Sequence, residues 1–184
     1  MKRYPHTPEG LAQRMEALQA LITEHYPDAL HTVRMVLGIV ATSCIRGNQY
    51  PTPVILVGPT SAGKTLVIEM LFPTDDDDKP MTKFMERCDD FTPASFVTHV
   101  GEKTEKELAK IDLLSCLPNR TLLTAELASM LRGKFDDLIP RFTKLTRILD
   151  GAGYVSRSGT QGRRGVNKAV VFQWLGGTTP IRIE

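Results

Sequence analysis

The sequence lacks most of the features that would assign it to a specialised class. Only three of its 184 residues are cysteines, and Cys44, Cys88 and Cys116 have no metal-ligand spacing. We therefore expect reduced cysteines in a cytosolic protein. The formal net charge is only +2, so no field over the whole molecule favours nucleic acid. Any contact with DNA must come from a local basic patch.

Long apolar runs are also missing. The longest, residues 33–45, is too short and too polar to span a bilayer. Residues 1–10 are polar and contain two prolines, unlike a signal peptide. We expect a cytoplasmic protein that does not associate with a membrane, and its length suits one ordinary domain with a full hydrophobic core.

One motif dominates what the sequence does contain. A short apolar run, residues 54–57, leads into G-x-x-x-x-G-K-T at residues 58–65, and an amphipathic segment follows. This is the pattern of a phosphate-binding P-loop, in which glycines let the backbone approach phosphates closely. The lysine reaches the outer phosphates, and the threonine hydroxyl binds Mg²⁺. The sequence therefore predicts a site for ATP and Mg²⁺, in which Thr65 binds the metal ion. The residues expected to contact the nucleotide are Gly58, Pro59, Thr60, Ser61, Ala62, Gly63, Lys64, Thr65 and Leu66.

The rest of the chain alternates between helical and strand patterns. Two amphipathic helices are expected first, one ending before Pro27 and one over residues 27–46. Later patterns predict helices over 64–71, 103–114, 126–131 and 138–149, strands over 54–57, 94–100, 120–124 and 169–175, and a hairpin over 154–166. Such alternation predicts an α/β fold of three layers, a parallel sheet with helices on both faces. We expect residues 1–50 to form helices that pack on a P-loop core of residues 51–184. After the helix expected over 64–71, residues 75–78 are four consecutive aspartates, which predict a solvated loop rather than a metal site.

Phosphoryl transfer to water also needs a carboxylate near the end of a neighbouring strand. Glu126 follows the apolar residues 121–124 in this way. Here the chain resembles the AAA+ ATPases, whose second motif is an apolar strand followed by Asp-Glu. The resemblance makes Glu126 the catalytic glutamate, but Ala125 replaces the aspartate that acts on the magnesium water shell. The alternative is that Glu126 is an ordinary carboxylate at a helix N-terminus.

In AAA+ proteins another strand lies between the strand before the P-loop and the strand before the catalytic glutamate. A polar residue at the tip of this middle strand contacts the γ-phosphate or the attacking water. In this chain the resemblance assigns that role to Thr179, with Thr178 as second choice, after the apolar segment that ends in Gly176-Gly177.

A glycine-rich hairpin precedes that last strand. It carries four basic residues and no acidic one between Tyr154 and Lys168, namely Arg157, Arg163, Arg164 and Lys168. One AAA+ branch, which includes replicative and superfamily III viral helicases, has a hairpin at this place that touches DNA. The resemblance implies DNA binding through these residues, and phosphate contacts need little beyond positive charge. Two alternatives remain: a solvated basic surface, or an arginine that acts on a neighbouring subunit's nucleotide.

From about residue 29 to the end, the chain resembles primase-helicase-like ATPase domains of bacterial and mobile-element proteins. A complete AAA+ module would continue into a fifth strand and a helical lid, so we expect a fragment or a minimal form that ends after the sensor strand. The leading interpretation is an ATP-hydrolysing motor core that acts on DNA, forms a homo-oligomeric ring in the full-length protein, and uses Lys64, Glu126 and Thr179 as catalytic residues. A nucleotide-dependent ATPase that remodels or recruits a protein partner is the alternative. A small-molecule kinase fits less well, because no mobile lid or paired basic acceptor site is visible.

Overall fold

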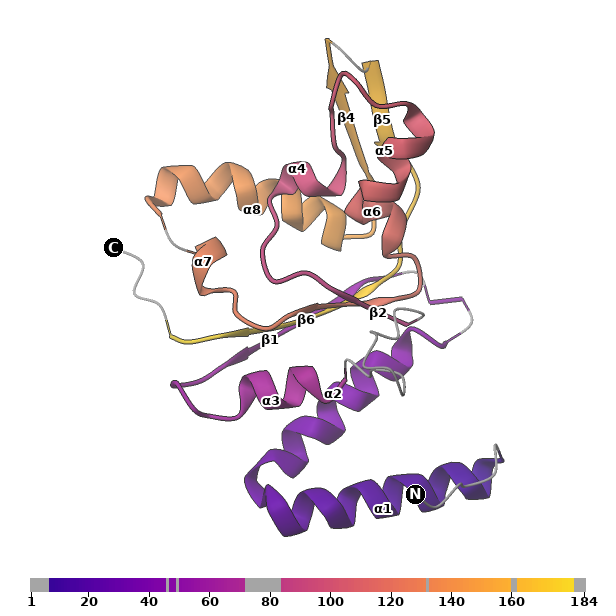
Figure 1. Ribbon diagram of the computed structural model, residues 1–184, viewed down its shortest axis with the longest axis vertical. Helices are drawn as coiled ribbons and strands as arrows, with labels where there is room; N and C mark the ends of the chain where they lie inside the picture. The colour runs from indigo at the N-terminus through magenta and orange to yellow at the C-terminus, as the bar shows by residue number, and fades with distance from the viewer. Residues whose placement is uncertain are drawn as a thin grey trace. The chain divides into compact units, whose positions relative to one another are not determined.

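The computed structural model describes residues 7–45, 47–48, 50–71, 84–131, 133–159 and 162–180 (Figure 1). The chain divides into two compact units, Met1–Gly38 and Ile39–Glu184. The division therefore lies inside a helix, whereas the sequence pattern had suggested a boundary near residue 50. The expected aspartate loop of residues 73–80 lies outside the described residues.

The first unit is helical. It contains α1 (Pro8–His25), the 3₁₀ turn η1 (Pro27–Ala29) and most of α2 (Leu30–Thr42). Thr7 caps α1, since its hydroxyl accepts the Gly10 N–H at 3.1 Å. Both expected helices are present, but the second begins with the 3₁₀ turn and ends at Thr42, before the expected limit of residue 46.

The second unit is built on a parallel sheet. Its strands in the described residues are β1 (Thr52–Val57), β2 (Met85–Arg87), β3 (Thr121–Thr124) and β6 (Gln173–Thr178), in the order β1-β6-β3-β2. The last strand in the chain thus lies between the first and the third, with Thr178 beside Val57 and Gly176 beside Thr124. Because all pairs are parallel, the carboxyl ends of these strands share one edge of the sheet.

Helices cover both faces of this sheet. In Figure 1, α3 (Lys64–Glu69) lies on one face, and α4 (Pro93–Phe96), α7 (Ala128–Leu131) and α8 (Phe135–Leu149) lie on the other. The second face holds the main core, in which Phe91 makes edge-to-face contacts with Phe96 and Trp174. The Trp174 indole N–H donates to Thr124 Oγ1 at 3.1 Å. These layers fit the expected three-layer α/β class.

The prediction of a strand over residues 94–100 is wrong. The segment begins as α4, because Thr92 and Ser95 form a capping box around Pro93 at the first helical position. The strand next to β3 is instead β2, a three-residue element too short to give a periodic signal.

Two other elements differ in extent from the sequence patterns. The pattern over 103–114 is split into α5 (Glu105–Ile111) and α6 (Leu113–Cys116), with Asp112 extended between them at φ −68° and ψ 117°. The strand expected over 169–175 is β6, which begins only at Gln173 and continues through both glycines to Thr178.

The predicted hairpin is confirmed as β4 (Tyr154–Ser158) paired with β5 (Gly162–Val166). Figure 1 shows it beside α5, extending away from the four-stranded sheet. Gly165 has φ +108°, and a Cβ there would lie 2.1 Å from the Tyr154 carbonyl oxygen. Only glycine fits where the two strands approach this closely.

Within the described part of the chain, no helix is both long and apolar enough to cross a membrane.

Candidate phosphate-binding site

The segment between β1 and α3 is an open loop. Ser61 and Gly63 adopt positive φ angles of 66° and 75°, a conformation that glycine adopts without strain. The Ala62 N–H donates to the Pro59 carbonyl at 3.3 Å, and a Cβ on Gly58 would lie 3.3 Å from the Ala62 Cβ. A larger residue at position 58 would therefore push into the bend.

Lys64 lies against the start of this same loop. Its ammonium group donates to the Gly58 and Pro59 carbonyls, each at 2.8 Å. An ammonium group has three N–H donors, so these contacts leave one for an anion. The backbone therefore holds the positive charge in the bend, where a phosphate chain would need it. Thr65, the expected Mg²⁺ ligand, is solvent-exposed at the start of α3.

The end of β6 joins the loop to the segment that follows β3. On one side, the Gly58 N–H donates to the Thr178 carbonyl at 3.2 Å; on the other, the Leu127 N–H donates to the Gly177 carbonyl at 2.7 Å. A Cβ on Gly177 would meet the Ala125 carbonyl oxygen at 2.8 Å and the Lys64 Cβ at 3.6 Å. The two glycines of the strand thus allow three segments, distant in sequence, to approach closely.

Glu126 lies at this junction with its side chain exposed. Its Oε1 accepts the Ala128 N–H at 2.9 Å, so the carboxylate caps the first turn of α7. This contact is the one expected of an ordinary helix N-terminal carboxylate, and it employs one of the two carboxylate oxygens.

The two threonines after the strand occupy different environments. Thr178 is the last residue of β6 and is only 4% exposed, and its hydroxyl donates to the Thr179 carbonyl at 3.0 Å. Thr179 is half-buried just beyond the strand. Both therefore lie at the sheet edge that carries the loop.

Sequence patterns alone missed a further carboxylate at this edge. Asp89 follows β2, and its Oδ1 accepts the Ala125 N–H at 3.4 Å, while its Oδ2 pairs with Arg87 Nε at 3.0 Å. Arg87 also lies 3.5 Å from Glu69 at the end of α3. An acidic pair directly after a strand was the available signal, but β2 is too short for its pattern to predict a strand.

The neighbouring thiol is kept in its neutral form. Burial raises the pKa of Cys88, and the negative charges of Asp89, Glu86 and Asp90 raise it further, although a hydrogen bond to the Asp90 backbone acts in the opposite direction. At neutral pH this cysteine is a thiol rather than a nucleophilic thiolate.

The hairpin distributes its basic residues over two faces. Arg157 and Arg163 are exposed and directly opposite each other across the strands, so their side chains share a face. Lys168 is also exposed. The structure places Arg164 differently from the expected DNA contact: its side chain is 6% exposed and pairs with Asp112 Oδ2 at 2.6 Å.

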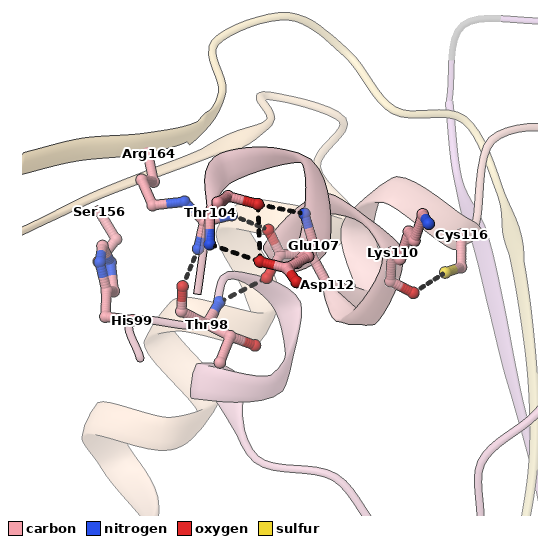
Figure 2. A network of polar contacts seen from close by, with 9 residues as sticks. All are labelled: Thr98, His99, Thr104, Glu107, Lys110, Asp112, Cys116, Ser156 and Arg164. Atoms are coloured by element: carbon pink, nitrogen blue, oxygen red, sulfur yellow. Dashed lines mark hydrogen bonds and ion pairs between the residues drawn. The ribbon is translucent and has the colours of Figure 1, made fainter. Parts of the chain in front are cut away.

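Figure 2 shows how this ion pair fixes the hairpin to the segment between β2 and β3. The Arg164 guanidinium also donates to the Thr98 carbonyl, and the other oxygen of Asp112 accepts the Thr98 N–H at 2.7 Å. A second contact joins His99 Nε2 and Ser156 Oγ at 2.8 Å. Arg164 therefore anchors the middle of β5 to this segment.

No site for a resident metal ion is found among the described residues, since none of them form a group of three or more His, Cys, Asp or Glu side chains placed to hold one. Mg²⁺ that enters with a nucleotide needs no such group, because phosphates and water supply most of its ligands.

An apolar cavity of about 360 Å³ lies elsewhere, between β1, β6, α7 and α8. Its lining includes Ile55, Trp174 and Phe142 and reaches Leu127 in the segment after β3, but it contains no residue of the phosphate loop.

Comparison with known proteins assigns no relative: the chain matches no protein-family model, no curated protein and no solved structure.

Proposed function

We propose that this chain is an ATP-binding and ATP-hydrolysing core of the AAA+ type that acts on DNA. The observation that carries the proposal is the position of β6. Its end contacts the phosphate loop through Gly58 and the segment after β3 through Leu127. This brings the lysine loop, the Glu126 segment and the threonines to one sheet edge, where ligands of open parallel sheets bind. The strand order supports the AAA+ resemblance, which expects a third strand between the other two.

In this proposal Lys64 binds the outer phosphates, Thr65 binds the Mg²⁺ that accompanies the nucleotide, and Glu126 orients the attacking water. Thr179, or the more buried Thr178, contacts the γ-phosphate. A bound magnesium ion would neutralise charge on the phosphates as they transfer. The open loop and the unused lysine donor support the fit of an anion here.

The second candidate is a nucleotide-dependent protein that recruits or remodels a partner with little hydrolysis. Two observations favour it: Ala125 occupies the position of the usual aspartate, and one Glu126 oxygen is bonded to the Ala128 N–H. The two candidates differ in turnover and share the nucleotide site.

Replacing Glu126 with Gln distinguishes them. A glutamine keeps an oxygen for the Ala128 N–H but cannot act as a base, so nucleotide affinity should be retained. If Glu126 orients or activates water, ATP turnover should fall by about 10²- to 10⁴-fold. Phosphate release and equilibrium dialysis with ATP measure the two quantities.

Glu102→Gln, at an exposed loop position, is the control and should match the wild type. Equal turnover in Glu126→Gln and the wild type would remove Glu126 from the mechanism. An absence of turnover in the wild type, with ATP still bound, would favour the second candidate.

DNA binding is proposed through the exposed face of the hairpin. Arg157 and Arg163 lie directly opposite each other, and like charges at such positions repel. A nucleic-acid phosphate between them would relieve this repulsion. The site is thus narrower than the sequence indicated, since Arg164 is held by Asp112.

Single-stranded DNA binding at several salt concentrations tests this face. Each phosphate contact on single-stranded DNA contributes a slope of about −0.7 in log affinity against log salt. The Arg157→Ala/Arg163→Ala variant should therefore bind more weakly and lose about 1.4 of the slope. Lys144→Ala, an exposed position on α8, should leave it unchanged. A double variant with the wild-type slope would show that the hairpin does not contact DNA.

A further inference from the structure

The alanine at position 125 leaves a specific gap in the proposed site. In the resemblance, this position carries the aspartate that acts on the magnesium water shell. Nothing in the Ala125 side chain can do so. In the folded chain, however, Ala125 lies beside a carboxylate from the segment that follows β2.

That carboxylate is Asp89. The parallel register of β2 and β3 pairs Arg87 with Leu123, and the ladder continues with the Cys88 N–H donating to the Leu123 carbonyl at 2.9 Å. Two residues further along the same register, Asp89 comes beside Ala125. The Asp89 Oδ1 contact with the Ala125 N–H at 3.4 Å confirms this neighbourhood.

The bonding of Asp89 leaves it able to interact with a cation. Its side chain is 55% exposed, and its Oδ2 is oriented by the Arg87 guanidinium at 3.0 Å. The contact of Oδ1 with the Ala125 N–H is at the long end for a hydrogen bond. A carboxylate oxygen has two lone-pair sites, so Oδ1 can still accept from water.

The other carboxylates nearby fit less well. One oxygen of Glu126 caps α7, and Glu69 is the last residue of α3, at the opposite end of that helix from Lys64 and Thr65. Asp90, although adjacent in sequence, is one residue beyond the position beside Ala125.

We propose that Asp89 takes the part of the missing aspartate and holds the water shell of the magnesium ion that accompanies bound nucleotide. This inference rests on the proposed nucleotide site. Mg²⁺ retains several waters and is held by one or two carboxylates together with substrate phosphates, which is the arrangement that Asp89 and Thr65 would supply. The carboxylate that acts on the ion would thus come from the segment after β2, and Glu126 would keep its separate role toward water.

Asp89→Asn in the full chain tests this role. The asparagine keeps an oxygen for the Ala125 N–H but loses the charge, so a purely structural contact would survive. Binding of a non-hydrolysable ATP analogue is measured by equilibrium dialysis over a series of Mg²⁺ concentrations and in EDTA. The Mg²⁺ concentration for half-maximal stimulation of binding should rise about tenfold or more, while binding in EDTA should not weaken.

Asp90→Asn is the matched control, because it removes the same charge one residue away, and it should behave as the wild type. Ala125→Asp added to Asp89→Asn should restore the Mg²⁺ response. An unchanged Mg²⁺ response in Asp89→Asn would overturn the role of Asp89 while leaving the nucleotide site intact. A wild-type chain that binds no nucleotide under any of these conditions would overturn both proposals.

Discussion

Lys64→Ala should abolish most ATP binding and lower ATP turnover by at least about 100-fold, the loss typical of removing one preorganised charge donor from a phosphate or oxyanion site. The reason is positional as well as electrostatic. The Gly58 and Pro59 carbonyls hold the ammonium group inside the bend, and no other lysine or arginine lies within residues 58–66. Equilibrium dialysis and phosphate release measure the two losses.

Lys106→Ala is the matched control, because Lys106 is an exposed lysine on α5. It should bind and hydrolyse ATP as the wild type does. Circular dichroism of both variants separates a lost contact from a lost fold. A well-folded Lys64→Ala chain with full ATP affinity would contradict the assignment of the loop.

Asp112→Ala should strongly destabilise the fold. It removes the partner of Arg164 from a pair in which each side chain is 6% exposed. Breaking a buried pair by deleting one partner leaves an uncompensated charge and costs about 3–5 kcal/mol. The Thr98 N–H loses its acceptor as well. For a chain of this size, the thermal midpoint should fall by at least about 6 °C.

A double variant identifies the cause of that loss. Arg164→Met added to Asp112→Ala removes the unpaired charge, and replacing a buried pair with apolar groups is often nearly neutral. The double variant should therefore recover much of the stability. Urea unfolding measures the free energies. Surface changes usually alter the free energy of unfolding by no more than about 0.5 kcal/mol. If Asp112→Ala changes it by no more than this, the ion pair does not hold the hairpin.

Local signals account for the parts of the fold that the sequence predicted well. The strand before the phosphate loop, the hairpin and the long helix α8 each carry a strong periodic or turn pattern. The segment 94–100 has strand-forming residues, but Pro93 and the capping box at Thr92 favour a helical turn. The last strand was expected to end at Leu175, before Gly176 and Gly177, since glycine weakens the interior of a strand. Both glycines lie within β6, where a Cβ would collide with the Leu127 side chain at position 176 and with the Ala125 carbonyl oxygen at position 177.

The residues of the candidate site could be predicted where they belong to one continuous segment. They were harder to predict where two segments come together only in the folded chain. The phosphate loop is contiguous, so its residues could be named directly. The hairpin arginines needed the strand register, because neighbours such as Arg163 and Arg164 point to opposite faces. The anchored face is determined by partners distant in sequence, above all the buried Asp112. Asp89 required both the existence of β2 and its register with β3, neither of which a three-residue strand reveals.

Amide hydrogen exchange of the full chain, with and without ATP and Mg²⁺, tests most directly whether a triphosphate binds to the loop after β1. Triphosphate binding at this loop should give new protection over residues 58–66, accompanied by protection around residues 125–127 and 177–179, and this protection should be lost in Lys64→Ala. Unchanged exchange over residues 58–66 at saturating ATP, or protection confined to the apolar cavity between β1 and α8, would contradict it.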